Sequence, residues 1–223
     1  MKKLIYIYIL LYSGICFSQN IFLTEVKATH ANKDKFLFAL QKQPDSTAQY
    51  LGKIEVSGYS SNDVEVFSEI YKKAKSVGSN TYVLRSPEAI DGAITFNPAH
   101  YYVYLYYIEA SKIPKQENII YIINPGKEVE LRLNNQKLNL PPRAYLQYDI
   151  SKDEITDIAA GKLLGSRIKF QAKTGQPEQY FQISGNKISA NTPVFPGINF
   201  KTGDIIKLEK SFALFLISIY QKK

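Results

Sequence analysis

Few residues of this chain have the types and spacing that catalysis or metal binding requires. The two histidines, His30 and His100, lie far apart in the sequence, and neither belongs to an H-E-x-x-H pattern. That pattern places two zinc ligands on one helix face, so the sequence gives no support for a zinc site. The G-x-S-x-G elbow of serine hydrolases is also absent. We therefore expect no metal, no cofactor and no catalytic residue that a motif would identify.

One group of acidic residues could hold calcium. Asp153, Glu154 and Asp157 lie close together, but the alternating oxygen ligands and the glycine of an EF-hand loop are missing. A solvated acidic loop is the simpler interpretation. A glycine-rich stretch at residues 161–166 lacks the Gly-Lys-Ser/Thr ending of a phosphate loop, and we interpret it as a turn.

A run of tyrosines at residues 101–107 is the feature that most suggests binding. Aromatic rings bring a large contact area with a polar tip, so they are common in glycan and protein interfaces. Alternation along a strand predicts a binding face of Tyr102, Tyr104 and Tyr106, or one of Tyr101 and Tyr107. The competing interpretation is a core strand, because tyrosine favours strands in general.

The N-terminus has the features of a signal peptide over residues 1–18. Lys2 and Lys3 precede an apolar run that ends at Ser18. The run is too short for a comfortable membrane span, although an uncleaved anchor is the alternative. Lipidation of Cys16 is a second alternative, but Ile15 is large for a lipobox. We expect an exported protein that is periplasmic, outer-membrane associated or secreted, with no membrane span after cleavage.

Composition sets the remaining limits on function. Cleavage after Ser18 would remove the only cysteine and two of the 28 basic side chains, which face 20 acidic ones. Disulfides and thiolate chemistry would then be excluded. The basic residues are spread along the chain, which is typical of a solvated surface with a positive bias. Because we expect export, nucleic-acid binding is not expected.

The first half is expected to form a small β-β-α-β-β domain over residues 19–110. Apolar positions and turn residues predict four strands, at residues 36–40, 50–58, 80–84 and 100–108. Asn62 as a helix cap, an apolar stripe at helical spacing and a terminal Gly78 predict a helix between the second and third strands. Residues 111–118 carry Pro114 and lack periodicity, so they form the expected linker.

The second half, residues 119–223, is expected to form an antiparallel β-sandwich-like domain, which gives an α+β protein. Short apolar segments predict strands at residues 119–123, 129–133, 138–140, 144–150, 155–159, 168–172, 179–183 and 204–208. Asn134 and Asn135 predict one hairpin, and residues 173–177 a second. The C-terminal residues 212–220 fit a helical face slightly better than a closing strand.

Two stretches resemble known families. Residues 51–58, a helix ending at residues 73–80 and then residues 82–84 resemble small periplasmic domains of stress-sensor envelope lipoproteins, with Ser79 where that pattern has alanine. The Tyr121-x-x-x-Pro125-Gly126 opening, an L-x-L-N-x-x-x-L hairpin and a late aromatic hairpin are similar to an uncharacterised family of exported β-sandwiches. The Phe17-Ser18-Gln19 junction is similar to that of Bacteroidetes exported proteins.

These resemblances imply an exported envelope protein without implying a catalytic residue. The main functional hypothesis is therefore a non-enzymatic protein of the cell envelope that binds another protein or the cell surface. The first alternative is a module that binds a glycan or small ligand through the tyrosine-rich strand. The second is a hydrolase with a dispersed site. The oligomeric state stays open.

Overall fold

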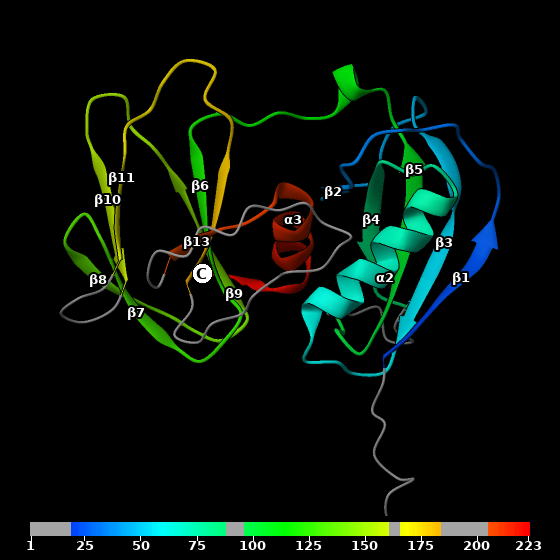
Figure 1. Ribbon diagram of the computed structural model, residues 1–223, viewed down its shortest axis with the longest axis horizontal. Helices are drawn as coiled ribbons and strands as arrows, with labels where there is room; N and C mark the ends of the chain where they lie inside the picture. The colour runs from blue at the N-terminus through cyan, green and yellow to red at the C-terminus, as the bar shows by residue number, and fades with distance from the viewer. Residues whose placement is uncertain (1–18, 88–95, 161–165, 184–204) are drawn as a thin grey trace, which may run out of the picture.

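The computed structural model describes residues 19–87, 96–160, 166–183 and 205–223. It has a β-rich α+β fold, which confirms the expected class (Figure 1). The expected leader at residues 1–18 and the glycine-rich turn at residues 161–165 lie outside the described residues, so both stay predictions. In the described part of the chain, no helix combines the length and apolarity needed to cross a bilayer.

The first half forms one five-stranded sheet, with the strand order β1-β3-β5-β4-β2. Its elements are β1 (Asn20–Val26), β2 (Phe38–Leu40), β3 (Gln49–Ser57), α2 (Asp63–Ser76), β4 (Thr81–Arg85) and β5 (His100–Tyr107). The pairing is antiparallel except between β2 and β4. The four predicted strands and the helix are confirmed, whereas β1 was not predicted. The alternation of polar and apolar residues in its sequence, NIFLTEV, is the pattern that could have predicted this strand.

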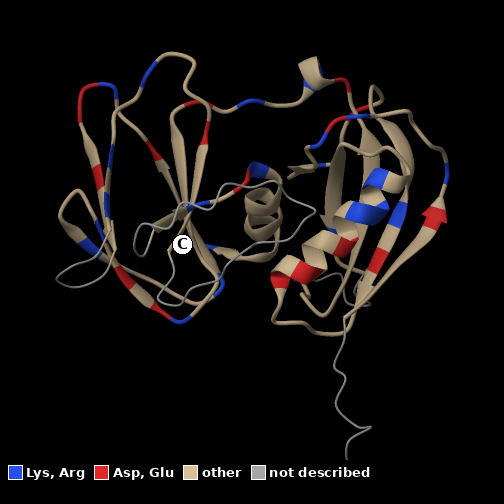
Figure 2. Ribbon diagram, in the orientation of Figure 1, with Lys and Arg blue, Asp and Glu red and all other residues tan. Residues whose placement is uncertain are grey.

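Helix α2 begins and ends where its local sequence predicts. The Asn62 side chain accepts a hydrogen bond from the backbone N–H of Glu65, while the Asn62 N–H donates to Ser60. The first turn is acidic and the last turn basic, which suits the helix dipole (Figure 2). Its buried side chains, including Phe67 and Ile70, pack on one face of the sheet in a core with the inward residues of β3 and β5.

Gly78, which follows α2, is required for two separate reasons. Its φ of +82° lies in the left-handed region, where a side chain is strained. A Cβ at this position would also lie 1.8 Å from the carbonyl oxygen of His30. The chain entering the sheet thus passes directly over the end of α2, where only glycine leaves room.

The second half contains two sheets in its described residues, with orders β11-β10-β7-β8 and β13-β12-β6-β9-β14. The elements are β6 (Ile119–Asn124), β7 (Val129–Leu133), β8 (Gln136–Leu140), β9 (Ala144–Asp149), β10 (Thr156–Ala160), β11 (Arg167–Phe170), β12 (Gln179–Ile183), β13 (Ile205–Lys207), α3 (Lys210–Ile219) and β14 (Gln221–Lys222). A second apolar core, which includes Ile122, Leu131 and Ile158, lies between the two sheets.

One predicted hairpin is confirmed and the other is wrong. Asn134 and Asn135 both have positive φ and join β7 to β8 in an antiparallel pair, as a two-residue turn requires. The hairpin predicted across residues 173–177 does not form. Strand β11 pairs with β10, whereas β12 pairs with β6 and β13 in the other sheet. Those residues turn the chain, as predicted, but they carry it from one sheet to the next.

The second half is also not wholly antiparallel, which corrects that part of the predicted fold. Strand β12 runs parallel to β6, and β14 runs parallel to β9. Parallel neighbours need a long crossover connection. Between β6 and β12 the chain forms β9 and the four strands of the other sheet, and between β9 and β14 it forms α3 among other elements, so both connections are long.

Helix α3 confirms the preferred interpretation of the C-terminus and lies between the two halves (Figure 1). It contacts β2 and α2 on one side and β6 and β12 on the other. Phe215 stacks on Phe67 of α2 with ring centroids 5.3 Å apart, and both belong to a core that also contains Tyr121 and Tyr180 of the second half. Between β5 and β6, a short 3-10 turn, η1 (Ala110–Lys112), overlaps the start of the predicted linker.

A polar cluster joins the halves at the C-terminal end of α3. Arg143, just before β9, donates two-pronged hydrogen bonds to the Asp63 carboxylate at 2.9 to 3.2 Å. The Tyr220 hydroxyl donates to the same carboxylate at 2.5 Å, and the Arg143 guanidinium lies 4.6 Å from the Tyr220 ring centre. The Asp63 side chain is only 12% exposed, so its charge depends on these partners.

The two constraints on Gly78 can be separated by comparison with Gly175, whose φ of +72° is similar but whose Cβ position is open. We expect Gly175→Ala to lower the free energy of unfolding by about 1 kcal/mol, from backbone strain alone. Gly78→Ala should cost more than about 3 kcal/mol, since it adds a backbone clash. Urea unfolding measures both. Equal losses would contradict the close approach of His30.

Removing the Asp63 charge should weaken the contact between the halves. Asp63→Asn keeps the shape of the side chain, and we expect a loss of about 2 kcal/mol in urea unfolding because Arg143 is left without its counter-charge. The control is Glu69→Gln, which breaks an exposed pair with Lys72 and should cost less than about 0.5 kcal/mol. Similar losses of unfolding free energy in the two variants would show that the Asp63–Arg143 pair contributes no more than an exposed ion pair.

Candidate functional site

The tyrosine run forms β5, and its side chains alternate between the two faces of the first sheet. Tyr101, Val103 and Leu105 point to the core and are 2%, 0% and 0% exposed. Tyr102 and Tyr104 are half-buried on the opposite face, and Tyr106 is more deeply buried there. The structure therefore brings together the first predicted set. It separates the two members of the second predicted set. Tyr101 lies in the core, whereas the Tyr107 ring stacks on the His30 ring with ring centres 3.5 Å apart.

Tyr50 of β3, which was not predicted, joins the three tyrosines on that face. Its ring centre lies 6.3 Å from that of Tyr104 and 5.5 Å from that of Tyr106. The ring centre of Tyr102 lies 6.4 Å from that of Tyr104 and 5.6 Å from that of His100. We call Tyr50, Tyr102, Tyr104 and Tyr106 the tyrosine face. With His100 they form a continuous row of rings about 20 Å long, from the rise of a strand.

Charged and polar side chains surround the tyrosine face. The Lys53 ammonium lies 5.0 Å from the centre of the Tyr102 ring, and the Arg85 guanidinium lies 5.5 Å from that of Tyr104. The Tyr50 hydroxyl donates to Glu25 at 3.1 Å. Burial, followed by this hydrogen bond, raises the pKa of Tyr50, so its hydroxyl stays a neutral donor.

A hollow of about 530 Å³ lies at one end of the tyrosine face. Tyr50, Tyr104 and Tyr106 form its aromatic side. Its polar wall comes from other elements: Glu25, Gln43, Asp45, Ser46 and Arg85. Arg85 is held by a hydrogen bond to Gln43. Rings on one side and amide, guanidinium and carboxylate groups on the other are the mixture that recognises polyhydroxylated ligands.

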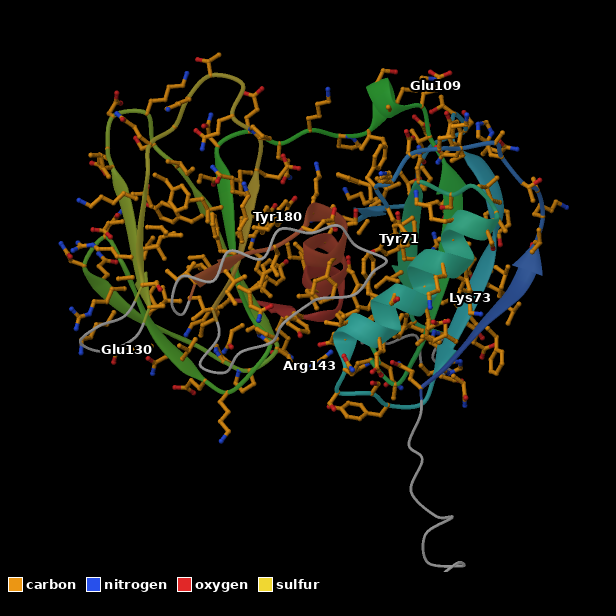
Figure 3. The ribbon with its side chains drawn as sticks, in the orientation of Figure 1. Tyr71, Lys73, Glu109, Glu130, Arg143 and Tyr180 are labelled. Atoms are coloured by element: carbon orange, nitrogen blue, oxygen red, sulfur yellow. The ribbon has the colours of Figure 1, made fainter. Side chains whose placement is uncertain are left out.

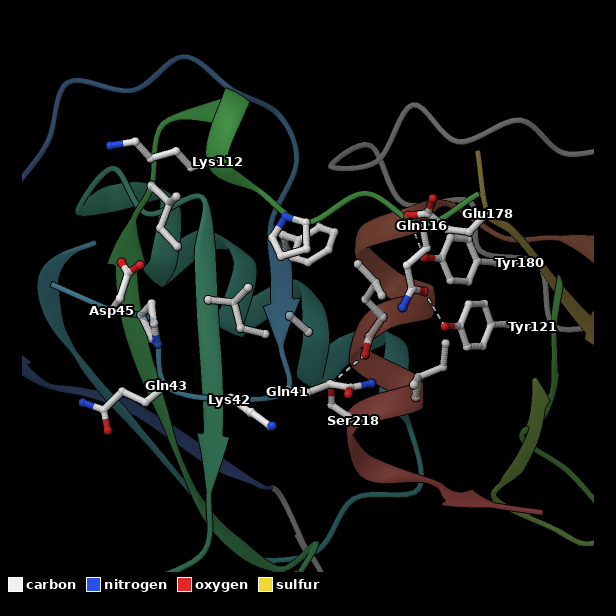
Figure 4. A pocket seen from close by; sticks show the side chains of 18 of the residues that line it. Gln41, Lys42, Gln43, Asp45, Lys112, Gln116, Tyr121, Glu178, Tyr180 and Ser218 are labelled. Carbon is white, nitrogen blue, oxygen red and sulfur yellow. Dashed lines mark hydrogen bonds between the residues drawn. The ribbon is translucent and has the colours of Figure 1, made fainter. Parts of the chain in front are cut away.

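A second, larger hollow of about 760 Å³ lies between the two halves, and we call it the groove (Figure 4). Its walls are β2, the segment that follows β2, the linker, α3 and the starts of β6 and β12. Its lining includes Ala39, Gln116, Tyr121, Glu178, Tyr180, Leu214 and Ile217. Its volume falls in the range of small-molecule sites, which is about 300–1,000 Å³.

The second-half wall of the groove is aromatic and hydrogen-bonded. Tyr121 and Tyr180 stack with ring centres 5.1 Å apart. The Tyr121 hydroxyl donates to Gln116 at 2.7 Å, and the Tyr180 hydroxyl donates to Glu178 at 3.3 Å (Figure 4). The Glu178 side chain is 4% exposed and pairs with Lys210 at 2.5 Å. Tyr180 and Arg143 lie near opposite ends of α3 (Figure 3).

Both groove tyrosines are neutral donors at physiological pH. Burial raises the pKa of Tyr121 to about 12. Burial, and after it the Glu178 carboxylate, raises the pKa of Tyr180 above its usual range. Sequence reasoning missed the groove because its walls come from segments far apart in the sequence, and only tertiary packing brings those segments together.

The two histidines considered for chemistry lie at opposite ends of β5. His100 begins β5 and bonds to Glu55 at 2.9 Å, whereas His30 lies beside Tyr107 at the other end, about 24 Å along the strand. Asp157 is tied to Arg167. Among the residues that the structure describes, no group of three or more histidine, cysteine, aspartate or glutamate side chains could hold a metal ion.

Comparison of the chain with protein-family models, curated proteins and solved structures finds no match to any of them. The resemblances to envelope lipoproteins and exported β-sandwiches therefore stay predictions.

The two sides of β5 should respond differently to truncation. We expect Tyr101→Ala to lower the free energy of unfolding by about 3–4 kcal/mol, because it empties a core position. Tyr104→Ala removes a half-buried ring and should cost about 1 kcal/mol. Urea unfolding followed by circular dichroism measures both losses. A larger loss for Tyr104 than for Tyr101 would contradict this placement.

Proposed function

We propose that this protein is exported and acts as a non-enzymatic binding protein of the cell envelope, with a surface carbohydrate chain as its ligand. The carrying observation is the continuous row of rings formed by His100 and the tyrosine face. A row of this length suits a chain-like ligand better than a single compact one.

The chemistry around the rings supports a sugar. Aromatic faces pack against the apolar C–H surfaces of a sugar ring, and polar side chains beside them bond to hydroxyl groups. Lys53 and Arg85 lie over Tyr102 and Tyr104, and Glu25 and Gln43 lie beside the hollow. These groups include both donors and acceptors, as hydroxyl groups require.

Export is supported by the sequence of residues 1–18. Cleavage after Ser18 would leave Gln19 as the first residue, directly before β1. We further propose that residues 19–110 form a small α+β domain that carries the tyrosine face. Residues 119–223 would form a sandwich-like domain that supplies one wall of the groove.

A second candidate function, the binding of an envelope protein, is favoured by β1. This strand is one edge of the five-stranded sheet, and Phe22 on it is 58% exposed. An open strand edge can pair with a strand of another chain. The bulge in β1 between Leu23 and Glu25 disturbs such pairing, which is why carbohydrate binding is the first proposal.

The tyrosine face is tested by the double variant Tyr102→Ala/Tyr104→Ala. In gels containing dissolved neutral or acidic polysaccharides, we expect the unmodified protein to be retarded by at least one of them. The double variant should lose at least tenfold in affinity, because both ring faces are removed.

The matched control is Tyr59→Ala, since Tyr59 is 54% exposed but lies outside the tyrosine face. It should migrate like the unmodified protein. Circular dichroism checks that each variant is folded. Unchanged retardation of a folded double variant would refute the carbohydrate proposal.

A further inference from the structure

The groove and the hollow of the tyrosine face are neighbours that share a wall. Gln43, Pro44 and Asp45, in the segment after β2, line both. The two hollows are therefore adjacent, with Pro44 at their common border. Because of this adjacency, one extended ligand could occupy both.

One wall of the groove offers backbone hydrogen-bonding groups. In β2, the N–H of Phe38 donates to Asn80 on the β4 side, at 2.8 Å. The N–H of Leu37 points the other way and donates to Ser211 of α3. Because backbone groups alternate along a strand, the N–H and carbonyl of Ala39 point in the direction of Leu37. Ala39 lines the groove, and within the described part of the chain β2 is the last strand on this side of the sheet.

The opposite wall offers neutral polar groups and apolar surface. The Gln116 Oε1 accepts from Tyr121, which leaves its Nε2 as a donor. Lys210 neutralises the buried Glu178, so this end of the groove does not select a charged ligand. Leu214 and Ile217 of α3 add apolar surface. A strand edge, a primary amide and apolar contacts together match an extended peptide.

We infer that the carbohydrate ligand carries an amide-linked peptide branch, and that the branch binds in the groove while the sugar lies on the tyrosine face. This inference rests on the proposed function. The branch pairs with the outward backbone groups of Ala39, and its next amide bonds to Gln116. An apolar side chain of the branch packs against Tyr121, Tyr180 and Ile217.

The test uses a disaccharide–tetrapeptide fragment of a bacterial cell wall, the same disaccharide without peptide and the tetrapeptide alone. Titration calorimetry should show that the intact fragment binds at least tenfold more tightly than either part. Gln116→Leu should reduce this advantage of the intact fragment severalfold and leave disaccharide binding unchanged. Gln136→Leu, an exposed glutamine on β8, is the matched control and should change nothing.

A second variant, Ala39→Pro, removes the backbone N–H that points into the groove, and an edge strand tolerates proline at such a position. Because Ala39 is only 9% exposed, circular dichroism and urea unfolding check that this variant keeps its fold. It should have the same effect as Gln116→Leu, and if it fails to fold, Gln116→Leu alone decides. Tyr102→Ala/Tyr104→Ala should weaken binding of both the intact fragment and the disaccharide.

Three results would overturn the inference: no tighter binding of the intact fragment than of the disaccharide, equal binding of the tetrapeptide alone, or an unchanged advantage in the groove variants. Failure of the proposed function looks different, because the tyrosine double variant would then still be retarded by polysaccharide. If the tyrosine double variant loses its retardation by polysaccharide but the intact fragment binds no more tightly than the disaccharide, only the inference of a peptide branch is refuted.

Discussion

The structure depends on the burial of α3 from two sides at once. Its residues are apolar almost all round, and a helix of that kind must be covered on every face. The first half supplies β2 and α2, and the second supplies β6 and β12. Because one helix satisfies both cores, the halves are held together through it. Asp63, Arg143 and Tyr220 then secure its C-terminal end with charge and hydrogen bonds.

The groove follows from the same constraint. Ser211 at the start of α3 meets the N–H of Leu37, so the helix covers the beginning of the β2 edge. Further along, Ala39 and Leu40 face Leu214, Ile217 and the second-half tyrosines across open space. The packing of α3 between the two halves thus leaves part of the β2 edge accessible. The tyrosine face does not depend on contact between the halves, because it lies on a single sheet.

Two predicted turns show that local sequence can locate a turn without determining which strands pair. Asn134 and Asn135 tolerate positive φ, and the strands on either side of them pair with each other. Residues 173–177 also turn the chain, but β11 and β12 pair elsewhere. Turn chemistry is decided by a few neighbouring residues. The choice of partner strand depends on which apolar faces must be buried together, and these come from distant segments.

The sequence by itself determined the positions of most strands, both ends of α2, the helical C-terminus and the division of β5 into two sets of tyrosines. Each of these follows from periodicity, capping or backbone conformation within a short window. Only the tertiary structure decided which set faces the core, that Tyr50 joins the outer set, and that side chains as far apart in the sequence as Phe38 and Ser218 line one groove. These outcomes depend on packing between segments far apart in the chain, and no local pattern encodes that packing.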